Sequence, residues 1–173
     1  IRSLSAIVMV AIVLGAIRLG SPYFEALISI IGFVAIVEWY KLILFNRLKI
    51  LNLFLMVLGI LYIVVPSLIL IWLRKNGPEG VYFVFWFLIV IWSTDVGAYF
   101  FGKSIGGVKL APKISPNKTW AGFFGGLGSA VVATLIFGFI FHPFWDGYLL
   151  FWACVVLSIV GQVGDLFESW CKR

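Results

Sequence analysis

Long runs of apolar residues divide the sequence, and short polar stretches separate them. A helix that crosses the ~30 Å hydrocarbon core of a bilayer needs roughly 20 mainly apolar residues. The runs are too long and too continuous for barrel strands, which alternate apolar and polar positions. Six runs approach or reach the spanning length: residues 3–19, 26–45, 50–73, 81–101, 120–141 and 148–167. The pattern therefore predicts an all-α, polytopic membrane protein with about six transmembrane helices.

The composition supports a partnership with the lipid bilayer rather than with nucleic acid. Hydrophobic residues make up 63% of the chain and charged residues only 12%, whereas a soluble domain carries about a quarter charged residues. Eight Trp suit side chains that lie at membrane interfaces. A net charge of +6 would suggest nucleic acid in a soluble chain. In a membrane protein, the excess of Lys and Arg on cytoplasmic loops explains it better.

The basic residues fall unevenly on the two sides of the predicted membrane. Ten lie on one side and three, Arg18, Arg74 and Lys75, on the other. Because cytoplasmic loops are enriched in Lys and Arg, the side with ten is expected to be cytoplasmic. The loop of residues 102–119 and the C-terminal end would then face the cytoplasm. We expect residues 1–91 to form a scaffold of transmembrane helices and residues 92–173 to carry the chemistry, since the polar residues gather there.

The first polar motif is WSTDVGAYFFGKS, residues 92–104. Asp95, Tyr99 and Lys103 follow one another at intervals of four, so they share one face of a helix. A carboxylate inside the membrane costs about 2.5–3.5 kcal/mol unless it is paired or hydrated. This cost favours a functional role for Asp95, with a local Asp–Tyr hydrogen bond as the alternative.

The second motif is KLAPKISPNKTWAGFFGG, residues 109–126. Ser115 is predicted to cap a helix and Pro116 to lie in its first turn. Free backbone N–H groups beside Lys118 would then favour a phosphate, although a merely anchored helix start fits equally well. Small residues four apart between 122 and 129 predict a close approach to a neighbouring helix.

The third motif is GQVGDLFESWCKR, residues 161–173. Asp165, Glu168, Ser169 and Lys172 lie on one helical stripe. A Glu168–Lys172 salt bridge explains two of them and leaves the presence of Asp165 unexplained. Two carboxylates at the end of a span favour a hard cation such as Mg²⁺, with further ligands supplied from elsewhere. Acids, a lysine and a phosphate-binding helix start together indicate phosphoryl or nucleotidyl transfer.

The segments TDVGAYFFG, KISPNKTWAGFFGG and GDLFESWCKR, in this order, resemble the bacterial CDP-diacylglycerol synthases, or phosphatidate cytidylyltransferases. The resemblance covers residues 92–173. It implies an enzyme of phospholipid biosynthesis that joins CTP to phosphatidate with Mg²⁺, giving CDP-diacylglycerol and pyrophosphate. It also implies a multi-pass protein of the bacterial inner membrane with its active site facing the cytoplasm. A homodimer is one option for its assembly.

The resemblance also implies roles for individual residues. Asp165, Lys118 and Lys172 would be catalytic, and Asp165 and Glu168 would hold the metal. The substrate-binding residues would be Asp95, Tyr99, Ser115, Thr119, Ser169 and Arg173. The family pattern continues with Lys-Asp, His-Gly-Gly and Asp-Arg-x-Asp, which this sequence lacks. With a first residue other than Met, the chain is expected to be a fragment that lacks the C-terminal part of the family fold and is inactive alone.

Two other functions stay open at this stage. A CTP-dependent polyprenol or phytol kinase also joins CTP to a membrane lipid, but it releases CDP rather than pyrophosphate. An ion-coupled transporter would use Asp95 and Asp165 as an ion path, yet transporters place polar groups near the midplane. The Asp-Gly-x-x-Ala-Arg pattern of CDP-alcohol phosphotransferases is absent.

Overall fold

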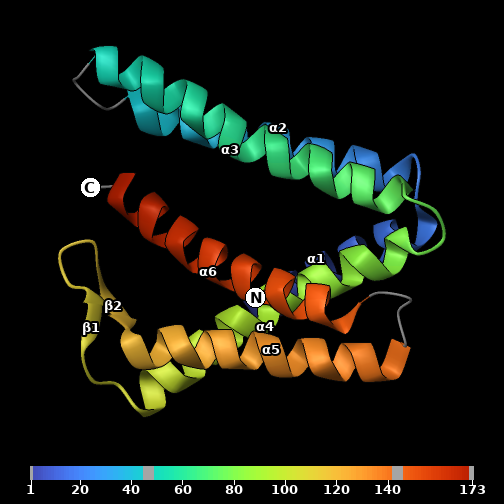
Figure 1. The fold of residues 1–173 in the computed structure, drawn as a ribbon. Helices are drawn as coiled ribbons and strands as arrows, with labels where there is room; N and C mark the ends of the chain where they lie inside the picture. The colour runs from blue at the N-terminus through green and yellow to red at the C-terminus, as the bar shows by residue number, and fades with distance from the viewer. Residues whose placement is uncertain (1, 45–48, 142–145, 172–173) are drawn as a thin grey trace. The chain divides into compact units, whose positions relative to one another are not determined.

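The computed structural model describes residues 2–44, 49–141 and 146–171. Within these ranges it contains six helices and a two-stranded hairpin (Figure 1). Each predicted apolar run forms a helix, so the all-α class is confirmed. The elements in chain order are α1 (Arg2–Leu19), α2 (Tyr23–Leu44), α3 (Lys49–Lys75), α4 (Gly80–Ser104), β1 (Lys109–Ala111), β2 (Ser115–Thr119), α5 (Trp120–Phe141) and α6 (Gly147–Cys171).

Five of the six predicted spans are long and apolar enough to cross a membrane. Among the described residues these are Tyr23–Lys41, Leu55–Lys75, Gly80–Ser104, Trp120–Phe141 and Gly147–Trp170. The first run contributes only a shorter apolar helix, Val8–Leu19. The multi-pass prediction is therefore supported with five spans, and the count of six is not reached within the part of the chain that is described.

The chain divides into two compact units, and the first is Ile1–Val84. In this unit α2 and α3 lie side by side (Figure 1). The Trp39 indole N–H donates to the Leu55 carbonyl at 3.1 Å and joins these helices. At the other end of α3, Arg74 Nε donates to the Ile17 carbonyl of α1 at 2.9 Å. The scaffold role predicted for this part stays a prediction.

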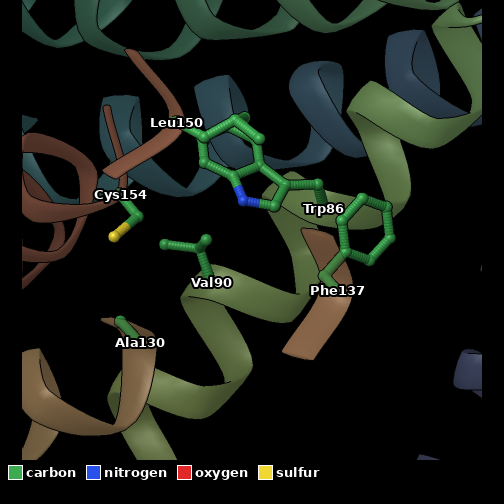
Figure 2. Packing of buried hydrophobic residues seen from close by; sticks show 6 residues of the cluster. All are labelled: Trp86, Val90, Ala130, Phe137, Leu150 and Cys154. Atoms are coloured by element: carbon green, nitrogen blue, oxygen red, sulfur yellow. The ribbon is translucent and has the colours of Figure 1, made fainter. Parts of the chain in front are cut away.

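The second unit, Phe85–Arg173, holds most of α4, the hairpin, α5 and α6. Its three helices share a buried apolar cluster, in which the side chains converge from α4, α5 and α6 (Figure 2). The members shown are Trp86, Val90, Ala130, Phe137, Leu150 and Cys154. The Trp86 indole N–H donates to Thr134 Oγ1 at 3.2 Å, so its polar atom is satisfied inside the cluster.

The small residues at the start of α5 let this helix approach α4 closely. A Cβ on Gly122 would lie 2.7 Å from the Ala98 carbonyl oxygen, and one on Gly126 would lie 2.8 Å from the Thr94 carbonyl oxygen. Neither distance is compatible with a side chain. The close helix approach predicted from the small-residue spacing is confirmed, with α4 as the neighbour.

The predicted helix start at Ser115 is wrong. Residues Ser115–Thr119 form β2, which pairs antiparallel with β1 through Lys109↔Thr119 and Ala111↔Ser115. A residue before proline avoids the helical region, and Pro116 is tolerated at the open edge of a two-stranded sheet. The cap of α5 is instead Thr119, whose Oγ1 accepts the Gly122 N–H at 3.1 Å.

Candidate active site

A cavity of about 480 Å³ lies within the second unit, beside the hairpin. Consecutive helices among α4, α5 and α6 run in opposite directions (Figure 1). The end of α4, the start of α5 and the later turns of α6 therefore meet at this cavity. The lining residues come from all three helices and both strands: Asp95, Ala98, Tyr99, Gly102, Lys103, Leu110, Asn117, Lys118, Thr119, Gly122, Phe123, Gln162 and Asp165. All three sequence motifs therefore contribute to one cavity.

Lys118 and Asp165 form the central ion pair of the cavity. Lys118 Nζ lies 2.9 Å from Asp165 Oδ2 and donates also to the Gln162 carbonyl at 3.3 Å. The two side chains are 29% and 56% exposed. Because solvent screens such a pair, it contributes about 0–1 kcal/mol to stability. The pair concentrates charge in the cavity without holding the fold together.

The first motif presents one face to the same cavity, as predicted. Asp95, Tyr99 and Lys103 all line it. Lys103 Nζ lies 3.4 Å from Tyr99 Oη and 5.6 Å from the centroid of its ring. In the described part of the chain Tyr99 thus pairs with Lys103, and no hydrogen bond to Asp95 is present. The Asp95 side chain shares this cavity with Asp165 and Lys118.

Other predicted site residues lie away from this centre. The Ser169 hydroxyl donates to the Asp165 carbonyl at 2.8 Å, a bond within α6. Glu168 is exposed, and neither it nor Ser115 is among the described residues that line the cavity. Lys172 and Arg173 lie outside the described residues, so the Glu168–Lys172 alternative and the roles of both basic residues stay predictions.

The start of α5 offers fewer free N–H groups than the sequence suggested. The Trp120 N–H donates to the Val108 carbonyl at 3.0 Å, and the Gly122 N–H is bonded to Thr119. These two groups cannot also bind a phosphate. Lys118 adds a full positive charge at this end of the cavity, where two N–H groups of the helix start are already bonded.

Sequence reasoning missed the buried polar residues Gln162, Ser158 and Thr94, which are 6%, 1% and 4% exposed. Gln162 Nε2 donates to the Phe123 carbonyl of α5 at 3.3 Å. The signal for them was present, since Ser158 and Gln162 stand four apart in an apolar run and Asp165 follows three later. Polar side chains inside a span are costly and mark interhelical contacts or function.

The carboxylates of the cavity determine what kind of metal site it could form. Across residues 2–44, 49–141 and 146–171, no group of three His, Cys, Asp or Glu side chains is placed to hold a metal ion. Two carboxylates, Asp95 and Asp165, do line the cavity. Mg²⁺ is usually bound through one or two carboxylates together with substrate phosphates. This donor set fits such a site and does not fit a closed cage of protein ligands.

Comparison with known proteins finds a family and individual relatives that match this chain. The cytidylyltransferase family matches residues 44–173. The phosphatidate cytidylyltransferase of Rickettsia bellii is 36% identical over 180 residues, which cover 100% of this chain and 74% of that protein. The enzyme of the same name from Bacillus subtilis is 48% identical over 102 residues, 58% of this chain and 38% of that protein.

The chain spans less than half of several of these relatives. The phosphatidate cytidylyltransferase of Brucella suis is 43% identical over 116 residues, which make up 66% of this chain but 42% of that protein. No solved structure matches the chain. The resemblance inferred from the three motifs is thus confirmed over the second unit and beyond it.

Proposed function

The chain belongs to the cytidylyltransferase family, and we propose that it transfers the cytidylyl group of CTP to phosphatidate. The products are CDP-diacylglycerol and pyrophosphate, and the activity belongs to the full-length protein. The observation that carries the proposal is the cavity in which the Lys118–Asp165 pair lies beside Asp95. A cation and two carboxylates in one cavity suit a reaction between two anionic phosphates.

The reaction we propose is a direct displacement. An oxygen of the phosphatidate phosphate attacks the α-phosphorus of CTP and forms a new P–O bond. The bond from the α-phosphorus to the oxygen that bridges it to the β-phosphorus breaks, and pyrophosphate leaves with that electron pair. Lys118 places a positive charge between the two substrates and offsets their mutual repulsion. No covalent enzyme intermediate is needed, because the phosphate oxygen is itself the nucleophile.

We propose Mg²⁺ as the cofactor of this step. Asp165 and Asp95 are the carboxylates of the cavity that would hold it together with the nucleotide phosphates. Such a cation supplies charge stabilisation to the α-phosphate and the leaving pyrophosphate. Glu168 stays a predicted ligand, since its position on α6 lies one turn beyond Asp165.

The proposed location is the bacterial inner membrane, with the cavity facing the cytoplasm. The support is the distribution of basic residues, of which Lys103, Lys109, Lys113 and Lys118 lie around the hairpin. This placement gives CTP access from water and gives phosphatidate access from the adjacent leaflet. A homodimer stays a prediction.

The test uses the purified full-length protein in liposomes with phosphatidate, CTP and Mg²⁺. We expect CDP-diacylglycerol and pyrophosphate in equal amounts, and we expect Asp165→Asn to lower the rate by about 100-fold or more. Asp146→Asn is the matched control, because Asp146 directly precedes α6 at the end opposite Asp165, where its Oδ1 accepts the Tyr148 N–H at 3.1 Å. That variant should keep the wild-type rate.

Other products would point to the other functions. Release of CDP with a phosphorylated lipid would replace the proposal by a CTP-dependent lipid kinase. Ion uptake into the liposomes without either product would support a transporter. Equal rates for wild type and Asp165→Asn would keep the reaction and remove Asp165 from its proposed role.

A further inference from the structure

Gln162 connects the wall of the cavity to the buried contacts between three helices. Its amide nitrogen lies 3.3 Å from the Phe123 carbonyl oxygen on α5 and 3.5 Å from Ser158 Oγ, one turn earlier on α6. Ser158 Oγ lies 3.1 Å from Thr94 Oγ1 on α4. The side chain is only 6% exposed, yet it lines the cavity. One amide and two hydroxyls thus link α4, α5 and α6.

The chemistry of these partners fixes the orientation of the amide. The Phe123 carbonyl can only accept a hydrogen bond, so the nitrogen of Gln162 must face α5. The amide also packs against Gly126, since a Cβ at that position would lie in ordinary van der Waals contact with Gln162 Nε2, at 3.4 Å. A carboxylate or an apolar side chain of the same length would fill this space but could not donate to Phe123.

The backbone of the same residue reaches the ion pair. The Gln162 carbonyl accepts from Lys118 Nζ at 3.3 Å, and the same ammonium lies 2.9 Å from Asp165 Oδ2. Gln162 therefore contacts α5 through its side chain and Lys118 through its main chain. This single residue of α6 therefore contacts both α5 and Lys118.

We propose that Gln162 is a positioning residue of the transfer site: its amide fixes α6 against α5 so that Lys118 and Asp165 meet in the cavity. This inference rests on the proposed function, because it assigns Gln162 a part in that reaction. Gln162 acts through Lys118 and needs no contact with the reacting phosphates.

The first test is a double-mutant cycle on the full-length protein in liposomes. Gln162→Leu should lower kcat/KM for CTP by about tenfold to 100-fold, and Lys118→Met should lower it further. If Gln162 acts through Lys118, adding Gln162→Leu to Lys118→Met should cost little more. Independent losses that multiply would overturn the proposal, as would wild-type activity of Gln162→Leu. Ser93→Ala, which removes only hydroxyl bonds within α4, is the control and should match wild type.

The second test needs no enzymatic activity. An amine-reactive label is followed at Lys118 by peptide mass spectrometry, with the exposed Lys109 as internal reference. Gln162→Leu should speed the labelling of Lys118 by about threefold or more, since its ammonium loses a fixed partner geometry, and Ser93→Ala should not. Unchanged labelling in Gln162→Leu would overturn the proposal. A wild-type protein without cytidylyl transfer would refute the proposed function, and the labelling result would still decide whether Gln162 positions Lys118.

Discussion

Lys118 Nζ lies 2.9 Å from Asp165 Oδ2 across 47 residues of sequence, and the pair joins the end of β2 to α6. Neither residue is buried deeply, so their attraction adds little to folding. The pair lines the same cavity as the side chains of Asp95 and Tyr99. Its consequences are therefore expected in activity rather than in stability.

Replacing Lys118 should lower the activity of the enzyme but leave its stability nearly unchanged. We expect Lys118→Met to lower kcat/KM for CTP by about 100- to 1,000-fold, the effect of losing one charge-stabilising donor. Thermal unfolding should change little, because the lost ion pair is worth about 1 kcal/mol at most. Lys109→Met on β1, whose side chain is exposed, is the control and should keep both values. An active Lys118→Met protein would contradict the role of this ammonium.

The contact between α4 and α5 should tolerate a methyl group only where there is space. Gly126→Ala would place a Cβ 2.8 Å from the Thr94 carbonyl oxygen, and such overpacking costs about 1–3 kcal/mol. Gly128→Ala is the matched control on the same helix, since nothing lies within 4 Å of a Cβ there. Thermal unfolding in detergent should show a lower midpoint for Gly126→Ala alone. Equal midpoints would mean that α4 and α5 lie too far apart for a Cβ on Gly126 to meet the Thr94 carbonyl.

The cap of α5 should follow Thr119 and not Ser115. Thr119→Ala removes the acceptor of the Gly122 N–H and should destabilise the protein by about 1 kcal/mol. Thr119→Ser keeps the hydroxyl and should restore most of that loss. Ser115→Ala in β2 should leave the unfolding midpoint unchanged. If Ser115→Ala were the more damaging change, the cap would lie at the start of the hairpin strand after all.

The orientation in the membrane can be measured with single cysteines. Pro112→Cys in the hairpin turn and Asn76→Cys between α3 and α4 are exposed positions, made in a protein with Cys154 and Cys171 replaced by Ser. In intact spheroplasts an impermeant thiol reagent should label position 76 at once and position 112 only after the membrane is disrupted. The reverse pattern would place the cavity on the outer face.

The helices could be predicted from the sequence because their signal is local and long. Runs of about 20 apolar residues leave the backbone no alternative to helix inside a bilayer. The hairpin could not be predicted in this way. Its strands have three and five residues, and their pairing depends on contacts between segments rather than on either segment alone. A Ser-Pro pair followed by an apolar run also fits a helix start, so the sequence around position 115 does not distinguish a strand from a helix start.

The candidate site was predictable where charge marked it. Asp95, Lys118 and Asp165 interrupt or flank apolar spans, and the structure brings them to one cavity. Gln162 carries no charge, and its role depends on a hydrogen bond to a carbonyl on another helix, 39 residues away in the sequence. Spacing along one helix cannot reveal which atom of a neighbouring helix an amide will reach.

The glycine contact between α4 and α5 also has an entropic consequence. Gly122, Gly126 and Ala98 have no side-chain rotamers, so packing these three residues together freezes no side-chain motion. Long side chains at the same positions would lose rotamer freedom each time the two helices pack together. Thr119, whose Oγ1 would lie 3.2 Å from a Cβ on Gly102, stands at the end of this contact. The part of the cavity wall at Gly122 and Ala98 therefore has no side-chain rotamers to rearrange when a substrate enters.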